Sequence, residues 1–467
     1  MIRVPTFCLA FTVVLTGCVT SPVYTLKPAP DHESCITSSP DKETIIGLAV
    51  SGGGSRAALF ASGAFEALGR IQVGPKHQSL LSQVSHVSSV SGGSLASAYY
   101  VLKKPPSETP ILTSSGELTE EYQRFFGQFK STMAQDFESL LLWRQIFSLR
   151  WFNPAWTAKS LAEILGEEYL GKTKFSDVAQ WEQDSSSPTL LINTTLYNDG
   201  RRLVLSTLSQ DALQYDFISS LPAPSVTNQL ERERERRLRA RWDTLQSRTA
   251  QDLKIDICRI PVSAAVAASM SFPPIIGPIS LHNEDEDQYW HIGDGGLSDN
   301  TGAESLIMVS LKQLQKGSAR RALIILIDSS FPFSVGGAAL NHRKEGFSLF
   351  SYDFSRIPSI MEERSVAYRA MFLDIAQHQG LLPDTRTISL IRLSHTHAQW
   401  KDDLSDLPES CRKEETSWRS PKEVVTHLAG IVTRLWLEST CDRDLILTSA
   451  AKVVAQNESK IREFLEQ

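Results

Sequence analysis

Several patterns that define large classes of protein are missing from this sequence. Its charged residues give a formal net charge of −6, so there is no excess of positive charge to bind nucleic acid. It has only 6 cysteines, and no CxxC or Cys/His spacing predicts a metal site. No internal repeat is present, and we expect no cofactor. What remains is an ordinary globular composition over 467 residues, enough for one large core with insertions or for two domains.

The N-terminus has an apolar stretch that is too short to span a bilayer. Residues 7–15 are apolar, whereas a mature spanning helix needs about 20 apolar residues. Arg3 precedes the stretch, and small residues followed by Cys18 end it, which is the arrangement of a cleaved signal. The segment resembles a bacterial lipoprotein signal, so we expect residues 1–17 to be removed and Cys18 to carry the lipid. The alternative is a plain secretory signal in which the cysteine falls by chance.

This signal predicts a place in the cell and a linker. Val19 follows the cysteine where an aspartate would favour the inner membrane, so by resemblance to enterobacterial sorting rules we expect the outer membrane. The protein would then be lipid-anchored in a bacterial cell envelope, on the periplasmic face. Residues 18–42 are rich in Pro, Ser, Thr and Asp, which predicts a linker that holds the body off the membrane.

Four cysteines remain after the signal and the lipidated residue are set aside. An oxidising compartment and an even number favour disulfides. Cys411 and Cys441 bracket one C-terminal segment and are the favoured pair, which leaves Cys35 with Cys258 by elimination. The alternative is that some of the four are free, buried cysteines.

Two strand–turn–helix units near the start of the body organise the chain. In the first, a buried-strand pattern at residues 45–50 leads into three glycines at 52–54 and a helix pattern at 57–68. In the second, an apolar run at residues 84–90 leads into Ser91, two glycines and a further helix pattern. A serine corner beside a glycine-rich turn is the outline of a nucleophile elbow next to an oxyanion hole.

The rest of the chain alternates between helix and strand patterns. Helices are predicted at residues 117–151, 157–165, 231–241, 264–271, 304–314, 361–378, 423–437 and 446–465, and strands at 189–196, 201–206, 255–260, 289–293, 322–327 and 388–393. The turn at 197–200 predicts a hairpin between the first two of these strands. The continuous apolar run at 322–327 is typical of a strand in a parallel sheet.

Two of the predicted helical stretches have unusual compositions. Residues 136–156 are rich in apolar and aromatic side chains, which fits either a helix packed on the core or a lid over a lipid-binding groove. Residues 231–241 alternate Arg and Glu, which predicts a solvated helix, with membrane-surface or partner binding as the alternative.

Ser91 is the candidate nucleophile. A serine hydroxyl becomes reactive when a base takes its proton and the resulting oxyanion is stabilised. Gly92 and Gly93 leave room for a tight corner after the strand, although Ser89 replaces the first glycine of the G-x-S-x-G pattern. The alternative is that this is a serine–glycine turn without chemistry.

The glycines at 52–54 are the candidate oxyanion hole. Consecutive glycines permit positive φ angles and let backbone N–H groups converge on an anion. Arg56, two residues later, would either add a positive charge near a phosphate or fix the loop.

A dinucleotide-binding turn is the competing interpretation of these glycines. Gly52, Gly54 and Ala57 satisfy the relaxed G-x-G-x-x-G/A spacing between a strand and a helix. That fingerprint also needs an acidic residue about 20 positions later, and none occurs between Glu66 and Glu108. The missing carboxylate makes nucleotide binding the weaker interpretation.

Asp294 is the candidate general base. It opens an Asp-Gly-Gly sequence that follows a short strand pattern, and a carboxylate there could take the proton of Ser91. A Ser–His–Asp triad is the competing mechanism, with His86, His291 and the later histidines as candidates, but none lies in a distinctive motif. The acidic run at 284–287 lacks the regular ligand spacing of an EF-hand and fits a solvated loop better.

The three motifs in this order resemble the patatin-like phospholipase family. The resemblance covers roughly residues 45–328 and includes the segment from Ala268 to the two prolines before the aspartate. Two positions depart from the family pattern, because Ser89 and Ala57 stand where glycine is usual.

The resemblance implies a fold and a set of roles. It implies an α/β protein, a three-layer α/β/α sandwich with a mostly parallel central sheet, helical insertions and a C-terminal extension. Residues 43–330 would form the catalytic domain and residues 331–467 a mixed α/β extension. Ser91 and Asp294 would form a catalytic dyad without histidine, with the amides of Gly52, Gly53 and Gly54 holding the oxyanion.

These inferences give a leading hypothesis and two alternatives. The leading one is a membrane-anchored serine lipid acyl hydrolase that works through an acyl-enzyme, with membrane lipids as substrate and anchor. One alternative is a lipoprotein that binds lipid or protein and has lost catalysis. The other is an acyltransferase, which would use the same residues with an acceptor other than water.

Overall fold

The computed structural model describes most of the chain. The described residues are 23–26, 35–39, 42–148, 150, 156–184, 186–215, 229–273, 276–330, 365, 367–368, 371, 382, 385–413 and 418–466. The predicted signal, Cys18 and most of the helix predicted at 361–378 lie outside them. Within the described part, no helix has the length and apolar character needed to cross a bilayer.

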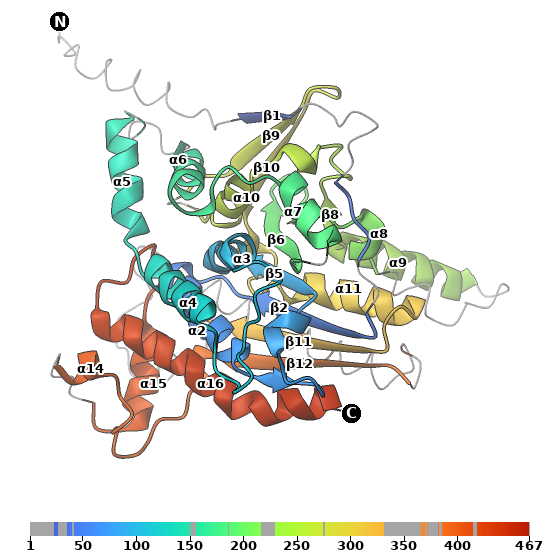
Figure 1. Ribbon diagram of the computed structural model, residues 1–467. Coiled ribbons are helices and arrows are strands. Elements are labelled where there is room, and N and C mark those ends of the chain that lie inside the picture. Colours follow the sequence, from blue (N-terminus) through green and yellow to red (C-terminus); the bar gives the residue numbers. More distant parts are fainter. Residues whose placement is uncertain are drawn as a thin grey trace, which may run out of the picture.

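One large sheet runs through the molecule, in the order β1-β9-β10-β6-β5-β2-β11-β12, with β7 and β8 branching from β6 (Figure 1). The strands β6, β5, β2, β11 and β12 are parallel, whereas β10 is antiparallel to both β6 and β9. A separate two-stranded sheet joins β3 and β4. The strands are β1 (Val23–Leu26), β2 (Thr44–Val50), β3 (Gln72–Val73), β4 (Gln78–Ser79), β5 (His86–Val90), β6 (Thr189–Leu196), β7 (Arg202–Leu205), β8 (Arg248–Thr249), β9 (Ile279–Asn283), β10 (Gln288–Asp294), β11 (Arg321–Asp328) and β12 (Thr387–Ser394).

Helices cover both faces of the parallel strands. Alternate residues of a strand point to opposite faces, and in β2 Ile46 and Leu48 join the core that includes α2 and α3, while Ile45 and Ala49 join the core of α11. The helices are α2 (Gly54–Gly69), α3 (Gly92–Lys103), α4 (Glu120–Met133), α5 (Phe137–Phe147), α6 (Thr157–Ile164), α7 (Phe175–Gln183), α8 (Gln210–Leu213), α9 (Gln229–Leu245), α10 (Val262–Ser269), α11 (Ala303–Lys316), α14 (Glu409–Lys413), α15 (Pro421–Gly430) and α16 (Thr440–Glu466). The predicted three-layer sandwich with a mostly parallel sheet is confirmed.

Local side chains explain where the observed elements depart from the predicted ones. The helix predicted at 117–151 is divided into α4 and α5, because Asp136 caps a new helix by accepting from the Ser139 amide. The strand predicted at 255–260 is wrong, since Asp256 accepts from the Cys258 amide and starts a 3₁₀ turn. The hairpin of β6 and β7 is confirmed, as is the solvated α9 helix, which has no buried residue.

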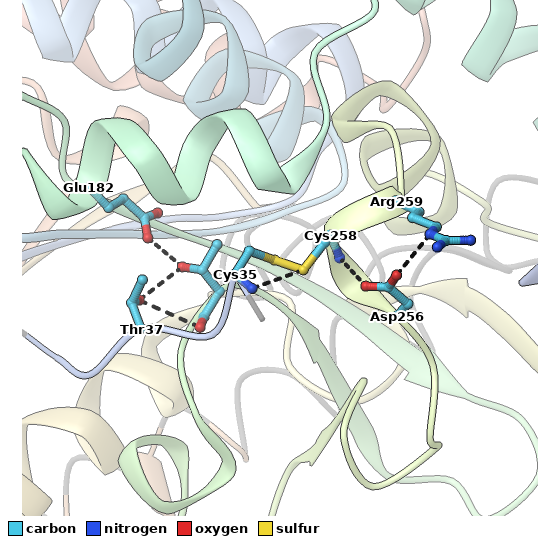
Figure 2. Close-up of a disulfide and its surroundings, with 7 residues drawn as sticks. Cys35, Thr37, Glu182, Asp256, Cys258 and Arg259 are labelled. Atoms are coloured by element: carbon cyan, nitrogen blue, oxygen red, sulfur yellow. Dashed lines mark hydrogen bonds and ion pairs between the residues drawn. A yellow bond between two sulfur atoms is a disulfide. The ribbon is translucent and has the colours of Figure 1, made fainter. Parts of the chain in front are cut away.

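Part of the segment predicted as a linker belongs to the body. β1 adds to the sheet as a parallel neighbour of β9, which fits the β-prone Val-Tyr-Thr-Leu sequence. Cys35 forms a disulfide with Cys258, and nearby Thr37 hydrogen-bonds Thr207 (Figure 2). This disulfide and the Cys411–Cys441 disulfide confirm both predicted pairs.

The C-terminal part shares the sheet and the core with the rest of the molecule. β12 extends the sheet beside β11, and α16 packs along α2. The contact is close because Gly63 has no side chain, and a Cβ there would lie 3.0 Å from the Cβ of Ala450. α16 therefore covers α2, the helix that follows the glycine turn.

Candidate active site

The three predicted motifs meet at one edge of the sheet. Val90, the residue before Ser91, lies opposite Asn193 in the parallel β5–β6 pair. β10 runs the other way and places Asp294 opposite Thr194, one residue further along β6. β2 is the other neighbour of β5 and leads directly into the glycine turn. Ligands bind at the carboxyl ends of strands in open α/β sheets, and the antiparallel β10 brings Asp294 to that edge.

Ser91 occupies the corner between β5 and α3 in a strained conformation. Its φ of 51° and ψ of −126° lie in a region that residues with a side chain rarely adopt. Its amide donates to the Ser269 hydroxyl at 2.9 Å, and that hydroxyl donates to the carbonyl of Asn193 at 2.6 Å. The surrounding structure thus holds the corner from the backbone side. Ser91 itself is partly exposed, while the following nine residues are buried.

Glycines after Ser91 let the two turns pack together. A Cβ on Gly92 would lie 2.0 Å from the carbonyl oxygen of Gly54, and one on Gly93 would lie 2.5 Å from that of Ser51. Neither position has room for a side chain. The close approach sets the glycine turn directly against the serine corner.

The serine at position 89 does not prevent the corner from forming. Ser89 is fully buried within β5, and its hydroxyl donates to the Leu191 carbonyl of β6 at 3.4 Å. A glycine at this position is therefore not required for the sharp turn two residues later. Ala57 is equally well accommodated, as a buried residue in the first turns of α2.

Asp294 is the last residue of β10, and its side chain is enclosed. Burial raises the pKa of the carboxyl to about 7, although hydrogen bonds from the Gly296 amide, at 2.7 Å, and from the Ser91 hydroxyl act to lower it. Its backbone is fixed on both sides, since its amide donates to Ser271 and its carbonyl accepts from Thr195. A carboxylate with this pKa that accepts from Ser91 can act as a base near neutral pH.

The glycine turn contains two different kinds of backbone amide. The Gly52 amide donates to the Asn300 carbonyl at 2.9 Å, so it is already engaged. The amides of Gly53 and Gly54 form no hydrogen bond within the described part of the chain. Both residues have positive φ angles, 141° and 60°, which a glycine adopts readily. These two amides at the start of α2 are the ones placed to receive an anion.

Arg56 is fully buried and ties this turn to distant segments. Its Nε donates to the Ser329 carbonyl at 2.9 Å, its Nη1 donates to the Ile431 carbonyl, and its Nη2 donates to the Thr433 hydroxyl at 3.3 Å. Of the two roles predicted from the sequence, this geometry fits fixing the loop. The guanidinium faces backbone carbonyls and a hydroxyl instead of an open surface.

Residues 431–434 form a strap across the glycine turn that the sequence did not reveal. The Ser55 amide donates to the Arg434 carbonyl at 2.8 Å, and a Cβ on Gly54 would lie 2.2 Å from that same oxygen. The predicted helix 423–437 stops at Gly430, and the next residues contact the turn instead. A half-open hollow of about 600 Å³ lies beside the strap, lined in part by His427, Arg434 and Trp436. The one sequence signal for this break is Gly430, because glycine is common at the C-terminal end of a helix.

Two of the candidate triad histidines, His86 and His291, have hydrogen-bond partners other than Ser91. His86 lies at the opposite end of β5, where burial lowers its pKa to about 3 and its ring bonds to Ser39 and Ser85. His291 hydrogen-bonds the Ser280 hydroxyl through Nδ1. The hydroxyl of Ser91 therefore has a carboxylate, and neither of these imidazoles, as its partner.

One comparison with known proteins matches more than half of the chain. A family model described as patatin-like phospholipase matches residues 48–307, which include the serine corner, the glycine turn and the aspartate. No curated protein matches the chain.

Several solved structures are similar at low identity. Human GIVD cytosolic phospholipase A2 is 12% identical with a TM-score of 0.47, over 91% of this chain and 60% of that chain. The same human protein in complex with methyl gamma-linolenyl fluorophosphonate is 15% identical, with a TM-score of 0.42, over 91% and 59% of the two chains. VipD from Legionella pneumophila is 12% identical, with a TM-score of 0.31, over 91% and 68%. The chain thus spans about three fifths of the length of the human structures.

Proposed function

Because the chain belongs to the patatin-like phospholipase family, we propose that it is a serine lipid acyl hydrolase that uses Ser91 and Asp294 as a dyad. Family membership supports lipid hydrolysis in general. The dyad rests on one observation, namely that a serine in a strained corner donates its hydroxyl to a buried carboxylate whose pKa is about 7. A serine held this way is exposed to substrate and has its base in place before substrate arrives.

The proposed reaction has two steps. Ser91 Oγ attacks the ester carbonyl while Asp294 takes its proton, and the oxyanion is held by the Gly53 and Gly54 amides. The tetrahedral intermediate then collapses to an acyl-enzyme and expels the alcohol, which takes the proton from Asp294. Water then attacks the acyl group with Asp294 as base again, and releases the fatty acid and Ser91.

Two other outcomes use the same residues. An acyltransferase would pass the acyl group from Ser91 to an alcohol in place of water. A non-catalytic lipoprotein would keep the fold but would not activate the serine. Analysis of the products formed from a phospholipid distinguishes the acyltransferase from the hydrolase. Labelling by a fluorophosphonate, which reacts only with an activated serine, distinguishes the non-catalytic lipoprotein from either enzyme.

The test compares three variants of the purified protein on a short acyl ester and on phospholipid vesicles. Ser91→Ala and Asp294→Asn should lower kcat by on the order of 10³-fold or more, because each removes a group that acts at the reacting bond. Ser91→Ala should also lose fluorophosphonate labelling. Ser89→Ala is the matched control and should keep activity, since Ser89 makes only a 3.4 Å bond to the Leu191 carbonyl. Undiminished activity in folded Ser91→Ala would refute the proposal.

The proposal also includes the anchor. Cys18 carries the lipid, the protein sits on the periplasmic face of the outer membrane, and membrane lipids are both its support and its substrate. Metabolic labelling with palmitate and membrane fractionation test this, since Cys18→Ala should lose the label and the processed mature form. Equal labelling of the two proteins would exclude Cys18 as the attachment site.

A further inference from the structure

Helix α5 exposes most of its large apolar side chains to solvent. Five of them form the α5 apolar face, with these exposed fractions: Leu140 37%, Leu142 59%, Trp143 54%, Ile146 38% and Phe147 80%. The Trp143 and Phe147 rings stack with their centroids 5.6 Å apart, so the most exposed part of the face is aromatic. Neither a core helix nor an ordinary surface helix has this pattern, and contiguous exposed apolar surface marks a binding surface.

The inner side of α5 shows that the helix is nevertheless seated on the body. Phe137, Leu141 and Gln145 are buried along one stripe at four-residue spacing. The helix packs against α6, and Arg144 forms an ion pair with Glu167 in the π-helical turn (Leu165–Leu170) that follows α6. The apolar face therefore points away from a fixed support, and the two sides of the helix have different roles.

β1, the first element that the structure describes, lies toward the same end of the molecule as α5 (Figure 1). Tyr24 of β1 lines a small cavity together with Ala264 and Ala268 of α10, and α10 packs against α6, so β1 and α6 both lie against α10. In the view of Figure 1, β1, α6 and α5 lie toward the upper left and α9 lies toward the right. Arg150, which pairs with Glu163, and Lys159 flank the same region and lie 5.1 Å and 4.7 Å from the centre of the Trp156 ring.

The short distance along the chain to Cys18 limits where a membrane can lie. β1 is hydrogen-bonded to β9, so only residues 19–22 lie between the proposed lipidated Cys18 and Val23, the first residue of β1. The five steps along the chain from Cys18 to Val23 reach at most roughly 18 Å when fully extended. A bilayer that holds this lipid must therefore lie close to the β1 edge of the molecule, beside α6 and α5.

We propose that the α5 apolar face inserts into this lipid surface and is a second membrane contact. Tryptophan and phenylalanine are favoured at the boundary between head groups and acyl chains. The orientation rests on the proposed lipidation of Cys18, but insertion does not depend on catalysis. With two contacts, the molecule is held in one orientation instead of swivelling about its anchor.

Quenching by brominated lipids tests the insertion directly. The full chain with Ser91→Ala, which removes turnover, is reconstituted into phosphatidylethanolamine–phosphatidylglycerol vesicles with or without dibromo-acyl chains. Trp143→Phe preserves the apolar face but removes its fluorophore, so it should lose most of the bromine-dependent quenching. Trp242→Phe on α9 is the control and should keep it. Equal quenching in all three proteins, or none in any of them, overturns the proposal.

A second pair of variants tests whether the face contributes to function at the membrane. In the chain with Ser91 intact, Trp143→Ser/Phe147→Ser should lower hydrolysis of vesicle phospholipid by roughly tenfold or more, because two large apolar groups no longer enter the lipid. Its hydrolysis of a soluble short acyl ester should not change. Leu230→Ser/Leu245→Ser, at exposed α9 positions, should change neither rate.

The outcomes distinguish this proposal from the proposed function. If the wild-type protein hydrolyses neither substrate, the function fails, while the quenching result still stands. If quenching is absent and the protein forms a concentration-dependent dimer that Trp143→Ser/Phe147→Ser abolishes, a second copy covers the face, and the membrane proposal is overturned. An equal loss of both activities in that variant overturns it as well, because the effect would not be specific to the membrane.

Discussion

At the scale of single residues, the carboxyl of Asp294 decides the pH at which the site can work. Burial raises its pKa to about 7, so below that pH the group is protonated and cannot accept a proton from Ser91. We expect kcat/KM on a soluble ester to rise about tenfold per pH unit below pH 7 and to level off above it. Ester hydrolysis rates measured from about pH 5 to about pH 9 cover both the rising part of the profile and its plateau.

Glu182 supplies a control for this profile. Burial also raises its pKa to about 7, but it accepts from Thr207 and Leu190 beside the Cys35–Cys258 disulfide, away from the serine corner (Figure 2). Glu182→Gln should therefore leave the acidic limb of the activity profile in place. If that variant loses the limb, the assignment of the profile to Asp294 is wrong.

The same shift has a consequence for stability. The pKa of Asp294 is about 7 in the folded protein, against an ordinary value of 3.8 for an aspartate, so protonation favours the folded state. This contribution is fully present below pH 3.8 and is lost as the pH rises through about 7. Asp294→Asn should consequently melt at a higher temperature than wild type above pH 7, with the gap closing toward pH 4. Melting curves by circular dichroism at several pH values test this expectation.

The sequence was sufficient to predict the candidate nucleophile and base but not their support. Ser91 and Asp294 stand in short motifs whose local geometry follows from neighbouring glycines, so they could be found without a structure. Thr433 and Arg434 contact the site through one hydroxyl and one backbone carbonyl. A backbone carbonyl is present in every residue, so no residue type at position 434 could predict this contact.

At the scale of elements, the strap at 431–434 controls the shape of the glycine turn. Gly54 has a φ of 60°, and a Cβ there would lie 2.2 Å from the Arg434 carbonyl oxygen, which is backbone and cannot rotate away. We expect Gly54→Ala to displace the turn from the strap and to lower kcat by roughly tenfold or more, because oxyanion donors act only when accurately placed. Steady-state kinetics on the soluble ester measure the effect.

Gly200→Ala is the matched control for this substitution. Gly200 has a similar φ of 75°, but nothing lies within 4 Å of a Cβ there. It should cost about 1 kcal/mol of stability from backbone strain alone and leave kcat unchanged. A Gly54→Ala protein with wild-type kcat would show that the strap does not position the turn.

Elements were predicted best where one periodic pattern decides them. β2, β11 and the β6–β7 hairpin were found because their apolar residues and turn sequences agree. The helix at 423–437 was predicted too long because its pattern continues past Gly430. There, the hydrogen bonds of Ser55 and Arg56 to residues 431–434 outweigh the local preference for helix. A competition of this kind depends on residues that are more than 370 positions apart.

At the scale of the whole molecule, the two disulfides constrain different parts of the chain. Cys35–Cys258 closes a loop with a separation of 223 residues and fixes the N-terminal segment to the body. Cys411–Cys441 closes a loop with a separation of 30 residues, and the strap at 431–434 lies within that loop. By loop entropy the first should stabilise the fold by about 5 kcal/mol and the second by about 4 kcal/mol.

Stability and activity should therefore respond differently to the loss of each bond. Cys35→Ala/Cys258→Ala should lower the melting temperature but keep kcat well below that temperature, because the serine corner and the glycine turn keep their contacts. Cys411→Ala/Cys441→Ala should lower both, since the strap loses the covalent link between the segments on either side of it and Arg56 loses a firm partner. Calorimetry and ester kinetics on the two variants test this. An equal loss of kcat in both, at a temperature where both are folded, would show that the strap is held by packing alone.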